Sequence, residues 1–534
     1  MATREELAMI RGARAGDAAA QLALGTRYLF GGGGLPQSLT TALHWLDRAA
    51  HQGESAAWML IGNHIPFETV RRSAKPLSYL VWYEHALDAG VLPAGLVFAS
   101  LVLETKPEPE PEPEPNLEPT SASDSALRNK ALQALQVAAQ AGIADAQWLL
   151  AQQASMASRG SAPAGPLTPP AAGPEETPLV WAGRAADGGV AQAQQVLAEH
   201  AWAASDWKGF LHRALPLARS LIDGSMHIIA EDAPDVLKAM AQRMAATDVT
   251  LLSRTAQALY GTAHADVVLM QRCWELAAYA GDRAAQLALG LWLARIDLDG
   301  ARAASVPGSA HYKKAIFWLT QAGEQGSDEA WFALSRIYLK AEFSQRSLPD
   351  ARRYLEQAAE MGHCAAQLEC GSSAWRNRRE AISNDVRAAY WLQKAAAQGS
   401  RESLLLLSKV ATPATPAPWA LAAQRQLTRD LIAAHPFLAA RIELAALFGL
   451  SRAEALLIDL DLADCGHCLQ VDIRAQNARS KRRLILLQTT EELQALHRIK
   501  RVFEDVDLGP DGPEGNYRQR QYRLRALVGT AGVA

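Results

Sequence analysis

The sequence predicts a mainly α-helical fold, in which an α-solenoid of helix-turn-helix repeats is followed by a small α/β module at the C-terminus. Three observations lead to this prediction. Alanine and leucine, which favour helices, dominate most of the chain, and β-branched residues are scarce there. A two-part motif recurs with a period of 36 or 37 residues, as is typical of repeat architectures. After Trp419 the composition changes, and short β-like runs begin.

Composition also limits the class of protein. The 534 residues carry a formal net charge of -3, which gives no global indication of nucleic acid or a membrane surface as partner. No apolar run reaches about eighteen residues, and the charged first residues lack the pattern of a signal peptide. The five cysteines are few and unevenly spaced, unlike a secreted disulfide framework. We therefore expect a cytoplasmic, bacterial-type protein with reduced thiols and no membrane span.

The first part of the motif starts at a glycine. The run AGDAAAQLALG at residues 15–25 returns nearly unchanged as AGDRAAQLALG at residues 280–290, and in part as MGHCAAQL at residues 361–368. The second part precedes such a glycine and has the form A-x-x-W-L-x-x-A-A. Its copies, one of which has Tyr in place of Trp, lie at residues 42–53, 315–326, 351–362 and 388–399.

The glycine between the two parts sets the period. Thirty-seven residues separate Gly16 from Gly53, and the same number separate Gly53 from Gly90. The later series Gly326, Gly362 and Gly399 has spacings of 36 and 37 residues. The interval from Gly281 to Gly326 is longer, at 45 residues, and we expect a loop around residues 301–309 to take up the excess.

Each repeat should fold as a pair of helices. The second part of the motif places apolar residues at i, i+3, i+4 and i+7, which is one stripe of a helix. Trp45, Trp318 and Trp391 are equivalent positions on this stripe, where we expect them to fill the gap between stacked helices. The boundary glycine ends the helix, and Gly25 or Gly290 in the next helix should permit close packing against the first. One pair cannot bury its stripe alone, so the pairs must stack.

This pattern resembles the SEL-one-like repeat, a relative of the tetratricopeptide repeat, over most of residues 10 to 410. Both parts recur in the right order and period, although residues 127–155 and 179–203 are degenerate and residues 204–265 have no clear register. The resemblance implies an α-solenoid that serves as a scaffold or adaptor and binds a protein or peptide partner. A secreted branch of the family staples each repeat with a cysteine pair, and this sequence lacks those pairs.

Proline-rich stretches divide the chain. Alternating Pro and Glu should be extended, because proline excludes regular structure and the carboxylates repel, so a solvated loop is favoured over a docking motif for a basic partner. The predicted organisation is SEL-one-like repeats at 1–105, a Pro-Glu linker at 106–126, a degenerate repeat at 127–157, a Pro/Gly/Ala linker at 158–178, further repeats at 179–410, a proline linker at 411–418, and an α/β module of unknown function at 419–534.

The C-terminal module resembles no family that we recognise. Two helical segments come first, followed by β-like runs at Leu456–Leu462, Cys468–Arg474 and Arg483–Gln488. Thr489 should cap a further helix that extends to Phe503.

One candidate function of the module is nucleic-acid binding. The residues around Gly449 have the spacing of a helix-turn-helix, with a small residue before the turn glycine and apolar anchors after it. Two basic groups could meet phosphates, namely Arg479, Lys481, Arg482 and Arg483, and then Arg518, Arg520, Arg523 and Arg525. The favoured alternative is a helical hairpin packed on the module, with solvated arginines, because the second helix would be short.

The second candidate is the motif Cys465-Gly466-His467-Cys468, which is also the redox site of protein disulfide isomerases. There a Trp precedes the motif and a helix follows. Here Asp464 precedes it and an expected strand follows, and an adjacent carboxylate raises a thiol pKa, so a redox role is not favoured. A zinc half-site at the same residues has no second CxxC to complete it, and His467 and His497 are loose candidates. We favour a turn that holds two reduced cysteines without tightly bound metal.

Three hypotheses about function follow. The first is a non-enzymatic scaffold or adaptor, which is favoured because the sequence has no phosphate-binding loop, G-x-G-x-x-G, H-E-x-x-H or G-x-S-x-G. The second is a regulator whose C-terminal module binds nucleic acid. The third is an enzyme in that module, with or without a metal ion. We expect a protein or peptide partner and no cofactor.

Overall fold

The computed structural model describes residues 4–32, 34–104, 121–160, 177–226, 234–262, 266–303, 308–509 and 511–528. The chain divides into two units, Met1–Ala280 and Gly281–Ala534. Most of the predicted Pro-Glu and Pro/Gly/Ala linkers, at residues 105–120 and 161–176, lie outside the described residues. No described helix combines the length and apolar character that crossing a membrane requires.

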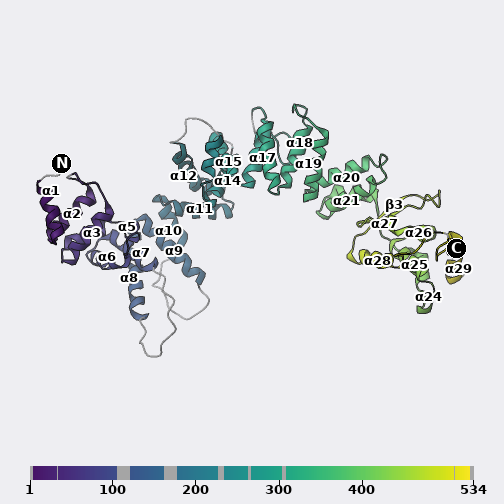
Figure 1. Cartoon of the computed structure of the whole chain (residues 1–534), viewed down its shortest axis with the longest axis horizontal. Helices are drawn as coiled ribbons and strands as arrows, with labels where there is room; N and C mark the ends of the chain where they lie inside the picture. The colour runs from purple at the N-terminus through teal and green to yellow at the C-terminus, as the bar shows by residue number, and fades with distance from the viewer. Residues whose placement is uncertain are drawn as a thin grey trace. The chain divides into compact units, whose positions relative to one another are not determined.

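The first unit consists of helices that follow one another as packed neighbours (Figure 1). They are α1 (Arg4–Ala15), α2 (Ala18–Phe30), α3 (Leu39–His51), α4 (Ser55–His64), α5 (Phe67–Arg71), η1 (Pro76–Tyr79), α6 (Leu80–Asp88), α7 (Leu92–Glu104), α8 (Ser121–Gln140), α9 (Ala144–Gly160), α10 (Pro178–Asp187), α11 (Ala191–Ala203), α12 (Trp207–Met226), α13 (Pro234–Ala241), α14 (Ala246–Tyr260) and α15 (Val267–Tyr279).

The second unit begins with repeat helices and ends in a module that contains a small sheet. Its helices are α16 (Arg283–Ala294), α17 (Tyr312–Glu324), α18 (Asp328–Leu339), α19 (Leu348–Met361), α20 (Cys364–Arg376), α21 (Asn384–Ala397), α22 (Arg401–Val410), α23 (Pro418–Gln424), α24 (Arg429–Ala434), α25 (Pro436–Phe448), α26 (Arg452–Leu457), α27 (Leu460–Ala463), α28 (Thr490–Arg501) and α29 (Tyr517–Val528). Its strands are β1 (Thr412–Pro413), β2 (Cys468–Val471) and β3 (Arg483–Leu486).

The boundary glycines end repeat helices in a backbone conformation that other residues rarely adopt. Their φ angles lie between +86° and +112°, at Gly16, Gly53, Gly90, Gly142, Gly281, Gly326, Gly362 and Gly399. The next helix then starts at a side-chain cap. Asp17 accepts a hydrogen bond from the backbone nitrogen of Ala20, and Asp282 accepts one from Ala285. Glycine and cap together fix the turn between the helices of a repeat.

A glycine inside the second helix of a repeat receives the leucine of the following helix. A Cβ atom added to Gly25 would lie 2.7 Å from Leu46 Cγ, and one added to Gly290 would lie 2.7 Å from Leu319 Cγ. Gly371 stands in the same relation to a leucine of α21. The expectation of close packing at these glycines is therefore confirmed, but the partner is the helix that follows and not the first helix of the pair.

A buried glutamine in the same helices forms a hydrogen bond with the backbone of the preceding helix. Gln21 Nε2 donates to the carbonyl oxygen of Ala13 at 3.1 Å, and its Oε1 accepts a hydrogen bond from Gln52 Nε2 at 2.7 Å. The same two bonds recur in a later repeat around Gln367. Because a buried amide without partners costs about 1–3 kcal/mol, this arrangement fixes the register between consecutive repeats.

The equivalent tryptophans differ in burial. Trp318 and Trp391 are 6% and 5% exposed, whereas Trp45 is half-buried. Leu319 and Leu392, which follow them, are fully buried in the stack. The tryptophans thus occupy the stripe that faces neighbouring helices, and Trp45 lies closer to its edge.

The C-terminal module is built around a mixed three-stranded sheet with the order β1–β3–β2, in which β1 pairs with β3 in parallel and β2 pairs with β3 antiparallel. The expected strands at β2 and β3 and the helix after Thr489 are confirmed. The strand predicted at Leu456–Leu462 is wrong. Local caps favour helical turns there: Ser451 and Glu454 form a capping box on α26, and Asp459 caps α27.

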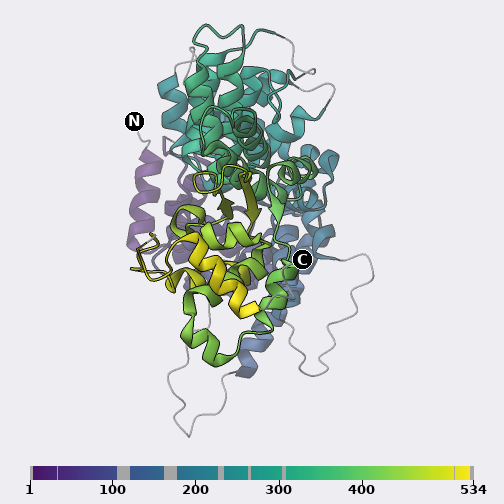
Figure 2. The ribbon, with the colours of Figure 1, turned by 90° about the vertical axis from the view of Figure 1, so that its right-hand side faces the viewer.

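The sheet packs on the last complete repeat. Cys468, Leu484 and Leu486 share one buried cluster with Ala388 and Leu392 of α21. The segment 411–418 joins α22 to α23 and contributes β1 to this sheet. Helix α29 (yellow in Figure 2) packs against α25 and α26. The module is therefore in direct contact with repeat helices inside the second unit.

Candidate functional site

A polar groove lies on the repeat helices α19, α20 and α21. It encloses about 230 Å³, and its lining residues are Arg352, Leu355, Glu356, Cys370, Ser373, Ala374, Asn377, Glu380, Asn384 and Arg387. That volume is below the range of about 300–1,000 Å³ typical of small-molecule sites, and it suits one or two side chains of a peptide. Sequence reasoning missed this groove, because it assigned roles only to the buried positions of the repeat.

Charges of both signs meet in the groove. Arg387 Nη2 and Glu356 Oε1 form an ion pair of 2.6 Å between α21 and α19, and both side chains are close to half exposed. Arg352, one turn before Glu356, is exposed. The Asn384 amide donates to the carbonyl oxygen of Asn377 at 2.8 Å. Burial raises the pKa of the Cys370 thiol at the floor to about 12, which keeps it neutral at physiological pH.

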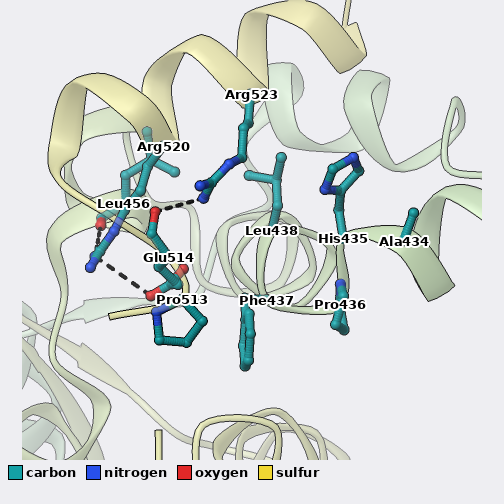
Figure 3. Close-up of a pocket in the computed structure, with 10 residues that line it drawn as sticks. All are labelled: Ala434, His435, Pro436, Phe437, Leu438, Leu456, Pro513, Glu514, Arg520 and Arg523. Carbon is teal, nitrogen blue, oxygen red and sulfur yellow. Dashed lines mark hydrogen bonds and ion pairs between the residues drawn. The ribbon is translucent and has the colours of Figure 1, made fainter. Parts of the chain in front are cut away.

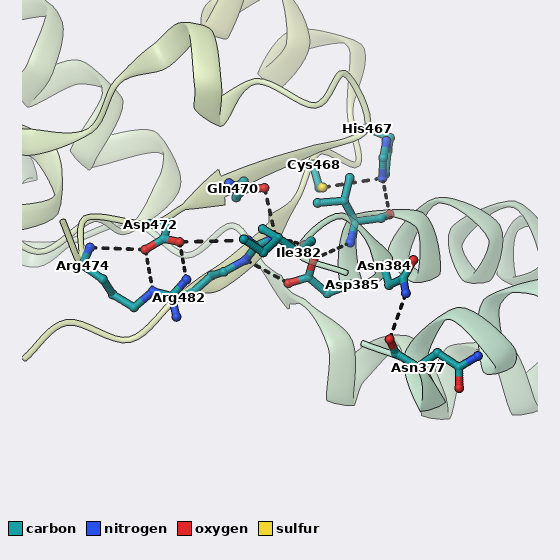
Figure 4. A network of polar contacts seen from close by, with 11 residues as sticks. Asn377, Ile382, Asn384, Asp385, His467, Cys468, Gln470, Asp472, Arg474 and Arg482 are labelled. Atoms are coloured by element: carbon teal, nitrogen blue, oxygen red, sulfur yellow. Dashed lines mark hydrogen bonds and ion pairs between the residues drawn. The ribbon is translucent and has the colours of Figure 1, made fainter. Parts of the chain in front are cut away.

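A second polar cluster lies where the module meets α21 (Figure 4). Arg482 makes a two-point contact with Asp385, with 3.0 Å from Nε to Oδ2 and 2.7 Å from Nη2 to Oδ1. Its Nη2 also donates to the carbonyl oxygen of Ile382 at 2.6 Å. Asp472 lies beside Arg482, and hydrogen bonds from Arg474 lower the pKa of the Asp472 carboxyl. Arg482 therefore connects the module to the repeat.

The Cys465–Cys468 motif forms the tip of the turn before β2. His467 Nε2 lies 3.0 Å from the carbonyl oxygen of Val386 on α21, and Nδ1 lies 3.0 Å from that of Cys465, so a neutral ring donates to one of the two. His467 Nε2 is also 3.5 Å from Cys468 Sγ. The motif thus touches the repeat directly, which the sequence did not indicate.

The two thiols of this motif have opposite pKa shifts. A hydrogen bond from Cys468 lowers the pKa of Cys465 to about 7, and this outweighs the upward effects of burial and of Asp464. The same hydrogen bond, together with burial, raises the pKa of Cys468. We expected Asp464 to raise the pKa of Cys465, and this expectation is wrong. The hydrogen bond from Cys468 lowers that pKa by more than the Asp464 carboxylate raises it.

The described residues contain no group of three or more His, Cys, Asp or Glu side chains that could hold a metal ion. His497, a loose candidate for zinc, is exposed on α28.

The basic residues considered for nucleic acid separate into exposed and internally paired groups. Arg479 and Lys481 are exposed. Arg482 is engaged with Asp385, and Arg483 donates to both carboxylate oxygens of Glu454 at 3.1 and 3.0 Å. The structure thus does not place these four residues on one free face.

The structure has the turn of the expected helix-turn-helix, but its second helix is short. Gly449 makes the turn with φ +64°, but the following helix α26 has six residues. Glu454, in the middle of that helix, is buried, and Arg483 with the backbone of Ser451 lowers its pKa although burial alone would raise it. Because its central residue forms an internal ion pair, α26 has few side chains free to contact base edges in a groove of DNA.

Of the arginines of α29, Arg520 and Arg523 point into the module (Figure 3), whereas Arg518 and Arg525 are exposed. Arg520 donates to the carbonyl oxygens of Leu456 and Leu508 at 2.9 and 2.7 Å, and Arg523 donates to that of Glu514 at 2.6 Å. Glu514 in turn forms a buried two-point pair with Arg441, at 2.6 Å for each contact. Glu514, Arg520 and Arg523 line a small cavity of about 260 Å³, and their hydrogen bonds indicate a structural role.

The helices form pairs that end at glycines with positive φ, and the pairs stack through the same leucine and glutamine positions. This arrangement defines the class of protein as an α-solenoid of helix-turn-helix repeats. Within it, the Sel1 repeat family model matches residues 18–54, 284–327, 329–363 and 377–400. These segments are Sel1 repeats, as the period and the motif indicated. The groove on α19 to α21 lies across the last two of them.

Two solved structures are similar to the chain. The crystal structure of a protective antigen present in uropathogenic Escherichia coli strains, which displays an SLR fold, is 18% identical, with 97% of this chain and 96% of that chain covered and a TM-score of 0.38. A Sel1 repeat protein from Oxalobacter formigenes is 19% identical, with 76% and 90% covered and a TM-score of 0.22. Neither TM-score reaches 0.5. No curated protein matches the sequence significantly.

Proposed function

We propose that this protein is a non-enzymatic, cytoplasmic scaffold or adaptor, and that the groove on α19, α20 and α21 binds a peptide segment of a protein partner. The observation that carries the proposal is the convergence of charged and amide side chains from three consecutive repeat helices in one small groove. Stacked helical repeats generate extended surfaces of this kind, and partner proteins commonly bind there.

The chemistry of the groove supports a peptide as the ligand. Asn377 and Asn384 carry amides that can both donate to and accept from a peptide backbone. Arg352 offers a planar cation for a carboxylate of the partner, and the Arg387–Glu356 pair presents both signs of charge. These groups are partly exposed, so dissolved salt can screen their attraction to the charges of a partner. The Debye length is about 8 Å at physiological ionic strength, and we expect the affinity to fall as the salt concentration rises.

Affinity capture from a lysate of the source cells tests the proposal. Arg352→Glu reverses a charge in the groove, whereas Arg353→Glu makes the same change at the adjacent position, where the guanidinium lies over Tyr354 outside the groove lining. We expect a specific partner to be retained by the wild type and by Arg353→Glu, and to be lost from Arg352→Glu. Equal retention by both variants would exclude the groove as the binding site.

A further inference from the structure

The two cysteines of the C-terminal module face each other across a tight turn. The backbone nitrogen of Cys465 donates to the carbonyl oxygen of Cys468 at 3.1 Å, and Asp464 pairs with Leu469 in an antiparallel bridge just outside them. Residues that lie opposite each other and are hydrogen-bonded in an antiparallel pair have Cα atoms about 5.5 Å apart. That separation is within the range of about 4.4–6.8 Å that a disulfide spans.

The environments of the two sulfur atoms are unequal. Cys465 is partly exposed, whereas Cys468 is fully buried in the cluster shared with α21. The Cys468 thiol donates a hydrogen bond to Cys465, which stabilises the Cys465 thiolate and lowers its pKa to about 7. An accessible thiolate beside a buried partner thiol is the arrangement in which one cysteine attacks an external disulfide and the other resolves the product.

We propose that Cys465 and Cys468 form a thiol–disulfide exchange site for low-molecular-weight disulfides, with Cys465 as the nucleophile and Cys468 as the resolving thiol. The Cys465 thiolate attacks one sulfur of the small disulfide, forms a mixed disulfide and releases one thiolate. Cys468 then loses its proton to that thiolate or to water, attacks Cys465 Sγ and releases the second small thiol. The two protein thiols are oxidised to one disulfide, and one small disulfide is reduced to two thiols.

The reaction has a structural consequence for the contact between the module and the repeat. His467 lies between the two cysteines in sequence and is next to the Val386 carbonyl oxygen on α21, while Cys468 packs against α21. Closing the disulfide replaces the hydrogen bond between the thiols with a bond of about 2.05 Å and so draws Cys468 Sγ closer to Cys465. We therefore expect amide hydrogen exchange to increase in the first turns of α21 on oxidation.

The other cysteines provide internal controls. Burial raises the pKa of Cys273 and of Cys370 to about 12, so both should stay unreactive in the folded chain. Cys364 is partly exposed on α20, and its thiol lies 3.8 Å from the carbonyl oxygen of Ala395. It is the matched control for an accessible cysteine that has no partner thiol in a turn.

Oxidised glutathione is the probe, applied to the reduced full-length chain and followed by acid quenching and peptide mass mapping. We expect the wild type to acquire a Cys465–Cys468 disulfide. Cys468→Ser should instead accumulate glutathione on Cys465, about tenfold more than the wild type at equal times, because intramolecular resolution is faster than a second encounter. Cys364→Ser should behave as the wild type does.

Several outcomes would overturn the proposal. The first is that glutathione persists on Cys465 of the wild type as long as it does in Cys468→Ser. The second is that Cys465 is modified in neither protein. The third is that the purified chain contains about one zinc ion per molecule. A second measurement does not depend on Cys468→Ser being folded. The rate of Cys465 alkylation by iodoacetamide in the wild type should reach half its maximum near pH 7, and a midpoint near 9, the ordinary value for a thiol, would contradict the hydrogen-bonded thiolate.

Discussion

Arg482, in the segment that leads into β3, forms a two-point ion pair with Asp385 in the first turn of α21, although the two residues are 97 positions apart in the chain. Their side chains are 11% and 20% exposed, so the pair is largely shielded from water. It joins the module to the last complete Sel1 repeat, together with the buried cluster around Cys468 and Leu392.

Arg482→Gln should therefore destabilise the second unit. The substitution leaves Asp385 partly buried without its cation, and a hydrogen bond to a charged group contributes about 1.5–3 kcal/mol. We expect a loss of about 2 kcal/mol in the free energy of unfolding, measured by chemical denaturation. Arg474→Gln is the control, because Arg474 pairs with Asp472 at a side-chain exposure of 52% and should cost less than about 1 kcal/mol. Equal effects of the two variants would contradict the role of the Arg482–Asp385 pair.

Gly290→Ala should also be destabilising, even though alanine favours helix. The new Cβ would lie 2.7 Å from Leu319 Cγ and force the two helices apart, at a cost of about 1–3 kcal/mol. Gly183→Ala, in helix α10, places its Cβ where no atom lies within 4 Å and should stabilise that helix by up to about 1 kcal/mol. Thermal unfolding of the two variants should shift in opposite directions. A stabilising Gly290→Ala would mean that the helices are not in close contact there.

Trp318→Ala tests whether damage stays local. Truncating a buried Trp costs about 3–5 kcal/mol, and in a repeat array the loss falls mainly on nearest neighbours. Hydrogen exchange should rise in residues 281–362, while the repeat at Gly16–Gly53 keeps its protection. Uniform loss along the chain would argue against a stack of repeats, and no loss at all would place the Trp318 ring on the surface.

The Glu454–Arg483 pair should make the module sensitive to acid. The folded state lowers the pKa of Glu454 below its ordinary value of 4.5, since Arg483 and Ser451 outweigh burial. The stabilisation is thus complete above about pH 4.5 and is lost as the pH falls through the lower, folded-state pKa. Glu454→Gln should be less stable than the wild type at pH 7, and the difference should shrink in acid. A difference in unfolding free energy that does not change with pH would refute this assignment.

The repeat could be predicted from sequence because its determinants are local. Gly16, Gly53 and their equivalents must adopt positive φ, and the Trp-Leu pair must face the stack, so period and burial follow from spacing. The strand predicted at Leu456–Leu462 failed because side-chain caps at Ser451 and Asp459 outweighed an apolar run.

The candidate sites were less predictable, because they depend on residues far apart in the chain. Arg482 and Arg483 looked like free cations, but Asp385 and Glu454 neutralise them from 97 and 29 positions away. The pKa of Cys465 follows from a hydrogen bond that no sequence pattern specifies. The groove on α19 to α21 is likewise formed by the variable positions of the motif, which carry no periodic signal.

Site-specific photo-crosslinking in the source cells tests the central claim, that the repeat groove binds a protein partner. A photoreactive residue replaces Arg352, in the groove, or Arg353, on the adjacent face of α19. Our account predicts a discrete cross-linked protein from position 352 and none of the same mass from position 353. Cross-linking of the same protein with equal yield from both positions, or no cross-link from position 352, would contradict it.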